Sequence, residues 1–312
     1  MADPGGSDWI RAFSRVVRLS VDSTSADFGD PEVSLVPFHG LSPILKSLQM
    51  FSIAPLTSQI INLVSTLPHL EDLAVTTIGE DEDTPVSRLS LTVPQPSPPF
   101  TGILDLSVYS GIGRMTRWLL GLPNDLHFRS LVFALNHEED PRSMNALVEK
   151  CSGTVESFAI TCYSAFVPFI RSTCYPQLSA EDTSPIHVDL SKATKLAKAI
   201  FLLPSMNAKC ITLALQTITR KHRNLRQISI HVPHETLADI EATRAVGEQI
   251  RGQWSDLDYL LAHFWDSRSI RPKISCNAPR GGRGKVNECV RRLLPEITRR
   301  EIIDFTEWGG YW

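Results

Sequence analysis

One short pattern of apolar positions recurs along the chain: an apolar residue, two variable residues, a second apolar residue, one variable residue and a third apolar residue. Alternation of apolar and variable positions is typical of a half-buried β-strand, so each copy predicts one strand. The apolar positions of the eight copies are Val16, Leu19, Val21; Leu45, Leu48, Met50; Leu70, Leu73, Val75; Ile103, Leu106, Val108; Phe128, Leu131, Phe133; Val155, Phe158, Ile160; Leu196, Ala199, Phe201; and Leu225, Ile228, Ile230.

Between these copies, apolar residues recur with the period of a helix, at i, i+3, i+4 and i+7. Each such segment predicts an amphipathic helix with one buried stripe. The stripes are Ile60, Leu63, Val64, Leu67; Met115, Trp118, Leu119, Leu122; Met144, Leu147, Val148, Cys151; Ile211, Ala214, Leu215, Ile218; and Leu257, Leu260, Leu261, Phe264.

The spacing of the copies indicates a solenoid. Successive copies begin 29, 25, 33, 25, 27, 41 and 29 residues apart, and five of these intervals match the length of about 20–29 residues of a leucine-rich repeat. The two longer intervals contain acidic or proline-rich insertions, at 80–83 with 94–99 and at 176–185. A strand and a helix of this kind bury their apolar faces only by stacking on neighbours. We therefore predict an α/β leucine-rich-repeat solenoid, a curved parallel sheet with outer helices.

We divide the chain into a disordered tail (1–12), the solenoid (13–275), and a basic loop with a C-terminal capping segment (276–312). The apolar side of the capping helix is Leu293, Leu294, Ile297, Ile302 and Ile303.

Composition narrows the class of protein. Lys and Arg number 31 against 34 Asp and Glu, a net charge of −3 that gives no overall attraction for nucleic acid or for an anionic membrane. The longest apolar runs have about five residues, such as 199–203, against roughly 20 needed to span a bilayer. The six cysteines form no CxxC pair and are interpreted as reduced, buried thiols. We expect a cytoplasmic or nuclear protein.

Several strings resemble those of the F-box/leucine-rich-repeat proteins of mushroom-forming fungi, over roughly residues 13–304. These strings are 13–21 (FSRVVRLSV), 188–196 (VDLSKATKL), 215–219 (LQTIT), 225–230 (LRQISI), 264–272 (FWDSRSIRP) and 294–300 (LPEITRR). The resemblance implies a substrate receptor of a ubiquitin ligase, in which an F-box docks the cullin-ligase adaptor and the repeats hold a target protein. An F-box needs roughly 40–50 residues, whereas the first copy begins at Val16, so the sequence looks like the repeat region only. We therefore expect no binding to the adaptor.

An alternative is a nucleotide-dependent enzyme that uses Gly111 and Gly113, which follow a strand copy and open a helix. Glu138, after the next strand, is placed roughly where a ribose-binding carboxylate would lie. The third glycine of the dinucleotide motif is replaced by Thr116, and the other strand–helix units lack a glycine loop, so a tight solenoid turn explains the glycines more simply. A truncated family member without an independent role is a third interpretation.

Other candidate motifs are incomplete. The run 281–285 (GGRGK) has Val286 where a phosphate loop needs Ser or Thr, and the segments 137–140 and 234–235 lack the second His of a zinc-protease helix. His187 is interpreted as a surface or satisfied core group. The stretch 268–300 carries ten Lys and Arg against Glu288 and Glu296, which we interpret as a solvated cap rather than a site for RNA or an acidic partner.

Side chains alternate across a strand, so the residues beside the inward positions predict a concave binding face. In the fourth copy these residues are Asp105, Ser107 and Tyr109. Aromatic anchors and an apolar pair mark the candidate site, with Asp72 and Asp105 selecting a basic or hydrogen-bond-donating partner. At Ile200 and Leu202 an alternative to a partner site is that a loop insertion, such as 176–185, folds over the Ile200 region and buries it. The candidate residues are Phe51, Asp72, Asp105, Tyr109, Ile200, Leu202, Gln227 and His231.

The sequence thus favours a non-enzymatic protein–protein interaction module. We expect no catalytic residue, cofactor or metal, an unidentified target protein as the partner, and neither membrane nor nucleic acid binding.

Overall fold

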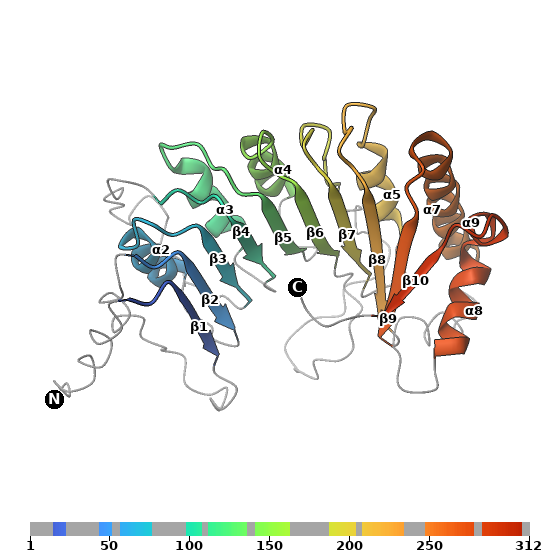
Figure 1. The fold of residues 1–312 in the computed structure, drawn as a ribbon, viewed down its shortest axis with the longest axis horizontal. Coiled ribbons are helices and arrows are strands. Elements are labelled where there is room, and N and C mark those ends of the chain that lie inside the picture. The colour runs from blue at the N-terminus through green and yellow to red at the C-terminus, as the bar shows by residue number, and fades with distance from the viewer. Residues whose placement is uncertain are drawn as a thin grey trace. The chain divides into compact units, whose positions relative to one another are not determined.

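The computed structural model describes residues 15–22, 44–51, 57–76, 98–107, 112–135, 141–162, 187–203, 208–233, 247–277 and 283–307. Ten strands are hydrogen-bonded in the order in which they occur in the chain, and their neighbours are paired in parallel (Figure 1). The predicted α/β fold class with a parallel sheet is confirmed. The predicted tail, residues 1–12, lies outside the described residues.

The chain divides into two compact units, Met1–Ala134 with Arg142–Val155 and Leu135–Pro141 with Glu156–Trp312. The elements of the first unit are β1 (Arg18–Asp22), β2 (Ser47–Phe51), α2 (Thr57–Ser65), β3 (Asp72–Val75), β4 (Ile103–Leu106), α3 (Ile112–Gly121), β5 (Ser130–Leu135) and α4 (Pro141–Lys150). Those of the second unit are β6 (Ser157–Cys162), β7 (Lys198–Leu202), α5 (Lys209–Gln216), β8 (Gln227–Pro233), α7 (Gly247–Arg268), β9 (Pro272–Asn277), α8 (Arg283–Leu293), α9 (Pro295–Arg299) and β10 (Asp304–Glu307).

The core of each unit lies between the strands and their helices. In the first unit the register aligns Leu48, Leu73, Leu104 and Leu131 in one row, and each is at most 1% exposed. Parallel strands need a crossover connection, and the predicted helical stripes supply the cover for this row. All five predicted stripes coincide with helices, and in α2–α5 each of their residues is buried.

In most described repeats, a single backbone carbonyl of the previous repeat accepts two consecutive N–H groups at the start of the next. The carbonyl of Val17 accepts the N–H groups of Lys46 (2.8 Å) and Ser47 (3.1 Å), and the carbonyl of Lys46 accepts the next two in the same way. In the second unit the carbonyl of Ala197 accepts Arg226 N–H (2.9 Å) and Gln227 N–H (3.2 Å). This arrangement satisfies the first backbone donors of each strand, which a buried strand start requires.

The fourth repeat corrects the predicted pattern. The structure pairs Leu104 with Leu73 and with Leu131, so Leu104 and Leu106 are the inward residues of β4, whereas the sequence assigned the second and third apolar positions to Leu106 and Val108. Val108 lies outside the described residues. Ile103, predicted as an apolar repeat position, is 46% exposed. Phe100, four residues before Leu104, fills the place that Phe128 fills three residues before Leu131, and both rings are fully buried. The spacing from Phe100 to Leu104 is therefore one residue longer than the spacing from Phe128 to Leu131. For this reason the predicted register of the fourth copy is shifted by two residues, with Leu106 at the position that Leu104 occupies.

Two strands were not predicted at all. β9 carries Pro272 opposite Ile228, and β10 carries Phe305 opposite Ile274. The register assigns the three pattern positions to Ser269, Pro272 and Ile274 in β9 and to Arg300, Ile303 and Phe305 in β10, so a polar residue stands at the first position of each and a proline at the second position of β9. β10 lies within the stretch predicted as basic loop and capping segment, so the strands continue beyond residue 276.

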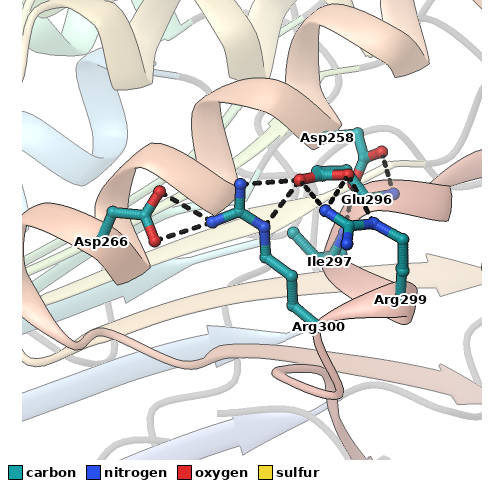
Figure 2. A network of polar contacts seen from close by, with 6 residues as sticks. All are labelled: Asp258, Asp266, Glu296, Ile297, Arg299 and Arg300. Atoms are coloured by element: carbon teal, nitrogen blue, oxygen red, sulfur yellow. Dashed lines mark hydrogen bonds and ion pairs between the residues drawn. The ribbon is translucent and has the colours of Figure 1, made fainter.

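The C-terminal helices of the second unit are joined by a polar network (Figure 2). The carboxylate of Asp258, only 3% exposed on α7, accepts the N–H groups of Glu296 (2.6 Å) and Ile297 (3.0 Å) at the start of α9. Arg300 contacts both Asp266 oxygens at 2.7 Å and also Glu296. Asp258 therefore caps α9 from another helix, and the arginine ties the end of α9 back to α7.

The structure describes the side-chain burial of three of the six cysteines. Cys151, Cys210 and Cys289 are buried and form no disulfide, and burial raises the pKa of Cys151 to about 12.

Among the described helices, none combines the length and the apolar content that crossing a bilayer requires.

Candidate protein-binding face of the sheet

The predicted binding residues that the structure describes lie on the strand face whose side chains point away from the helices, which we call the non-helical face. Its positions alternate with the inward rows, because successive side chains of a strand point to opposite sides. The register places the middle positions side by side, as Gln49, Ala74, Asp105 and Val132 in the first unit and as Ala159, Ile200 and Ser229 in the second.

Phe51 and Asp72 occupy this face in the first unit, and both are half-buried. Phe51 ends β2, next to Met50, whose carbonyl accepts Thr76 N–H (3.1 Å). Asp72 has an internal role, because its Oδ1 accepts the backbone N–H of Ile103 at 2.8 Å. This carboxylate therefore has one oxygen engaged in joining β3 to β4.

Asp105 lies in the middle of β4, between Ala74 and Val132, which are 7% and 6% exposed. Its Oδ1 accepts the backbone N–H of Ser107 at 3.0 Å and also the Ser107 hydroxyl. Burial raises the pKa of this carboxyl, and the Ser107 hydrogen bonds oppose that rise. Tyr109, assigned to the same triplet, lies outside the described residues. The alternate positions that the structure describes are Ile103 and Asp105 in β4 and Ser107 directly after it.

In the second unit Ile200 is 2% exposed, so its side chain is not available on the surface. The insertion 176–185, the predicted cover, lies outside the described residues. Leu202 is half-buried and is paired by the register with Thr161 on one side and His231 on the other.

His231 and Gln227 lie on β8, and both are half-buried. His231 Nδ1 and the Ser275 hydroxyl are hydrogen-bonded to each other. Burial lowers the pKa of His231 to about 4, with the charge of Lys198 acting in the same direction, so the imidazole is neutral at pH 7. Gln227 Nε2 donates to Ser229 Oγ at 2.7 Å, and the register places Gln227 beside Lys198.

The alternative motifs are only partly described. Gly113 lies in the first turn of α3, while Gly111 and Glu138 lie outside the described residues. The same holds for 137–140, 234–235 and 281–282, whereas Gly284 belongs to α8. His187 is exposed at the start of a described segment. Within the described part of the chain, no group of three or more His, Cys, Asp or Glu is arranged to hold a metal ion.

The basic stretch 268–300 makes many contacts within the protein. Arg299 and Arg300 contact Glu296, and Arg292 contacts Glu288. Arg268 donates to the carbonyls of Thr219 and His222, while Arg271 and Arg291 lie over the rings of Trp265 and Phe305. These contacts account for much of the local positive charge.

A second basic stretch escaped the sequence analysis. Residues 187–233 contain eight Lys and Arg and one acid, Asp189, a net charge of 8 − 1 = +7. The same charge count that selected 268–300 would have found it. The number of charged residues in 187–233 does not by itself show which of these cations the fold brings together.

Three comparisons were made with known proteins. No family model, no curated protein and no solved structure matches the chain.

Proposed function

We propose that the chain is a non-enzymatic protein-binding module that holds a target protein on the non-helical face, in the manner of the target-recognition arm of an F-box ubiquitin-ligase receptor. The observation that carries the proposal is the set of half-buried side chains that alternation and register bring to this face: Gln49, Phe51 and Asp105 in the first unit, and Leu202, Gln227 and His231 in the second. Parallel sheets are ordinarily covered on both faces, and stacked repeats build extended binding surfaces from side chains that each repeat contributes.

The contacts available to a target differ between the two units. In the first unit Phe51 supplies an aromatic anchor and Asp105 a carboxylate, both half-buried. In the second unit Leu202 and His231 form an adjacent pair with a neutral imidazole. Aromatic residues contribute strongly to binding at interface centres, so Phe51 is the residue on which the proposal depends most directly.

Affinity capture with matched variants tests the proposal. The full chain is immobilised, and proteins retained from the source cells are quantified by mass spectrometry. We expect the double variant Phe51→Ala/Leu202→Ala to lose a set of partners that wild type retains. The control variant Asn62→Ala/Arg117→Ala, exposed on α2 and α3, keeps them.

For a purified partner, Phe51→Ala is expected to weaken binding by about 1–3 kcal/mol, without a matching loss of thermal stability. Equal capture by wild type and the Phe51→Ala/Leu202→Ala variant would move the binding surface off this face.

A further inference from the structure

The second unit carries a basic surface where its strands begin. Seven cations lie in or beside the two turns that precede β7 and β8, and all are exposed except Lys198, which is half-buried. We call this surface the basic edge, and it consists of Lys192, Lys195, Lys198, Arg220, Lys221, Arg223 and Arg226.

The two turns are held firmly against each other. His222, fully buried, contacts the carbonyl of Leu190 through Nε2 at 2.8 Å. The backbone N–H of Leu190 in turn donates to Thr217 Oγ1 at 2.9 Å. Arg268 from α7 donates to the carbonyl of His222 at 2.9 Å and also to that of Thr219. A surface built on such fixed turns is preorganised, so its cations need little ordering when a ligand binds.

A shallow pocket of about 470 Å³ lies between these turns. Its lining combines three cationic side chains with two hydroxyl-bearing residues: Ser191, Lys192, Thr219, Arg220 and Lys221. Cations and hydroxyl donors around one hollow are the groups that recognise a compact anion with several acceptor oxygens.

The neighbouring charges do not cancel this arrangement. Asp189 is the single acid of residues 187–233, and its carboxylate accepts the N–H of Ser191 at 2.8 Å. The exposed Glu156 lies beside Lys198, whose N–H donates to the Glu156 carbonyl at 3.0 Å, and it is not among the residues that line the pocket. Burial by itself would raise the pKa of Asp189, but the hydrogen bonds from Ser191 and the charges of His187 and Lys192 together lower it. Asp189 offsets part of the charge of Lys192, while Arg220 and Lys221 belong to the other turn. Arg268 is committed to the two carbonyls and is not counted as a ligand contact.

We infer that the basic edge binds a phosphorylated segment of the target protein, with one phosphate group in the pocket between Lys192, Arg220 and Lys221. Clusters of cations that include arginine are a recurrent device for recognising phosphorylated motifs. The remaining cations, Lys195, Lys198, Arg223 and Arg226, flank the pocket and favour acidic residues beside the phosphate. The inference rests on the proposed function, because it assigns the chemistry of the target.

Nucleic acid fits the surface less well. In the described parts of 187–233, Phe201 is the one Phe, Tyr or Trp side chain, and it is 1% exposed. Proteins that bind single strands stack successive bases on exposed aromatic rings, and the basic edge offers none. Neighbouring strands lie about 4.8 Å apart, so the two turns present cations over the length of a short peptide segment rather than along a duplex.

Fluorescence anisotropy with the full chain tests this inference. The probe is a pool of fluorescein-labelled 11-residue peptides with a central phosphoserine and randomised flanks that include Asp and Glu. The same pool without phosphate, inorganic phosphate as competitor, and a 12-nucleotide single-stranded DNA complete the set. We expect the phosphorylated pool to bind at least about tenfold more tightly than the unphosphorylated pool, with affinity falling as salt rises.

Two variants locate the site. Arg220→Gln/Lys221→Gln removes two pocket cations, and Arg117→Gln/Arg251→Gln removes the same charge from exposed positions on α3 and α7. We expect the first to weaken phosphopeptide binding at least about tenfold and the second to change it less than about twofold. Circular dichroism and melting temperature verify that both variants are folded.

The outcomes separate the alternatives. Equal affinity for the two peptide pools, or equal weakening by both variants, would overturn phosphate recognition at the basic edge. Tighter binding of the oligonucleotide that is lost in Arg220→Gln/Lys221→Gln would overturn it in favour of nucleic acid. Intact phosphopeptide binding together with unchanged partner capture by the Phe51→Ala/Leu202→Ala variant would instead overturn the non-helical face while leaving the basic edge in place.

Discussion

Asp72 Oδ1 accepts the backbone N–H of Ile103 at 2.8 Å, and this hydrogen bond replaces a step in the backbone ladder that joins successive repeats. At the start of other repeats, one carbonyl accepts the N–H groups of two consecutive residues. At the start of β4, the carbonyl of Glu71 accepts the Gly102 N–H (3.1 Å), and the Ile103 N–H donates to Asp72 instead. The extra residue after Phe100 moves Ile103 away from the usual acceptor. A side chain of β3 thus completes the hydrogen bonding of β4.

This relationship makes Gly102 intolerant of a side chain. A Cβ built on Gly102 would lie 1.7 Å from Asp72 Oδ1, so Gly102→Ala has to displace the carboxylate from Ile103. We expect Gly102→Ala to lower the free energy of unfolding by about 1–3 kcal/mol, because the Ile103 N–H loses its acceptor. In an Asp72→Ala background the same change is expected to cost clearly less. Urea denaturation of the four proteins of this cycle measures the coupling, and additive effects would contradict the prediction.

Glu301 adopts a left-handed conformation with φ of 54° although it is not glycine. Such a conformation costs a residue with a Cβ roughly 1–2 kcal/mol. We expect Glu301→Gly to raise the free energy of unfolding by about 0.5–1 kcal/mol, because relief of the strain exceeds the backbone entropy that glycine loses. As a control, Gln216→Gly in α5 is expected to lower it by about 1 kcal/mol. A destabilised Glu301→Gly protein in thermal and urea denaturation would show that the side chain outweighs the strain.

Leu131 is fully buried on the inward side of β5, whereas its neighbour Ser130 is half-buried on the other side. Leu131→Asp is expected to lower the free energy of unfolding by about 3–5 kcal/mol, because it places an unpaired charge in the core. Ser130→Asp is the matched control and is expected to cost under about 1 kcal/mol. Circular dichroism in urea compares the two, and a stable, natively folded Leu131→Asp protein would contradict the register of β5.

His231 makes stability depend on pH. Its pKa is about 4 in the folded chain, below the ordinary value of 6.5, mainly because of burial. Between pH 6.5 and 4 the unfolded chain binds a proton that the folded chain does not, so this contribution to stability is complete above pH 6.5 and is lost as pH falls. His231→Gln is expected to reduce the drop in urea midpoint between pH 7 and pH 5. The exposed control His69→Gln is expected to leave the drop unchanged.

Asp258 caps α9 through two backbone N–H groups while being nearly inaccessible to solvent. Asp258→Ala removes the acceptor of both groups and is expected to cost about 1.5–3 kcal/mol, the value of hydrogen bonds to a charged partner. Asp256→Ala, an exposed site on the same helix, is expected to cost under about 0.5 kcal/mol. Hydrogen exchange of the Ile297 amide provides a local readout, and unchanged protection in Asp258→Ala would contradict the capping role.

The predicted binding residues differ in how accessible the tertiary structure leaves them. Phe51, Leu202, Gln227 and His231 are half-buried on the predicted face, whereas Ile200 is buried and an oxygen of Asp72 is used by Ile103. Alternation along a strand predicts the direction of a side chain, but its exposure depends on what covers it. The basic edge shows the same limit, since its cations come from two turns that only the stacking of repeats brings together.

The sequence by itself determined the five helices that carry a continuous apolar stripe and most of the strands, because amphipathic periodicity is a local property that each segment carries alone. It did not predict α8, which begins within the stretch assigned to a basic loop. The register of β4 and the existence of β9 and β10 were decided only by the tertiary structure. Among the described residues, the three non-glycine residues with positive φ, Phe100 (43°), Ser269 (57°) and Glu301 (54°), each lie three positions before one of these strands. Phe, Ser and Glu have no local preference for that conformation. At Phe100 a contact with the preceding repeat accompanies it, since the Phe100 N–H donates to the Leu70 carbonyl at 3.2 Å. The place where this repeat becomes longer therefore depends on contacts between repeats, which a pattern within one segment does not contain.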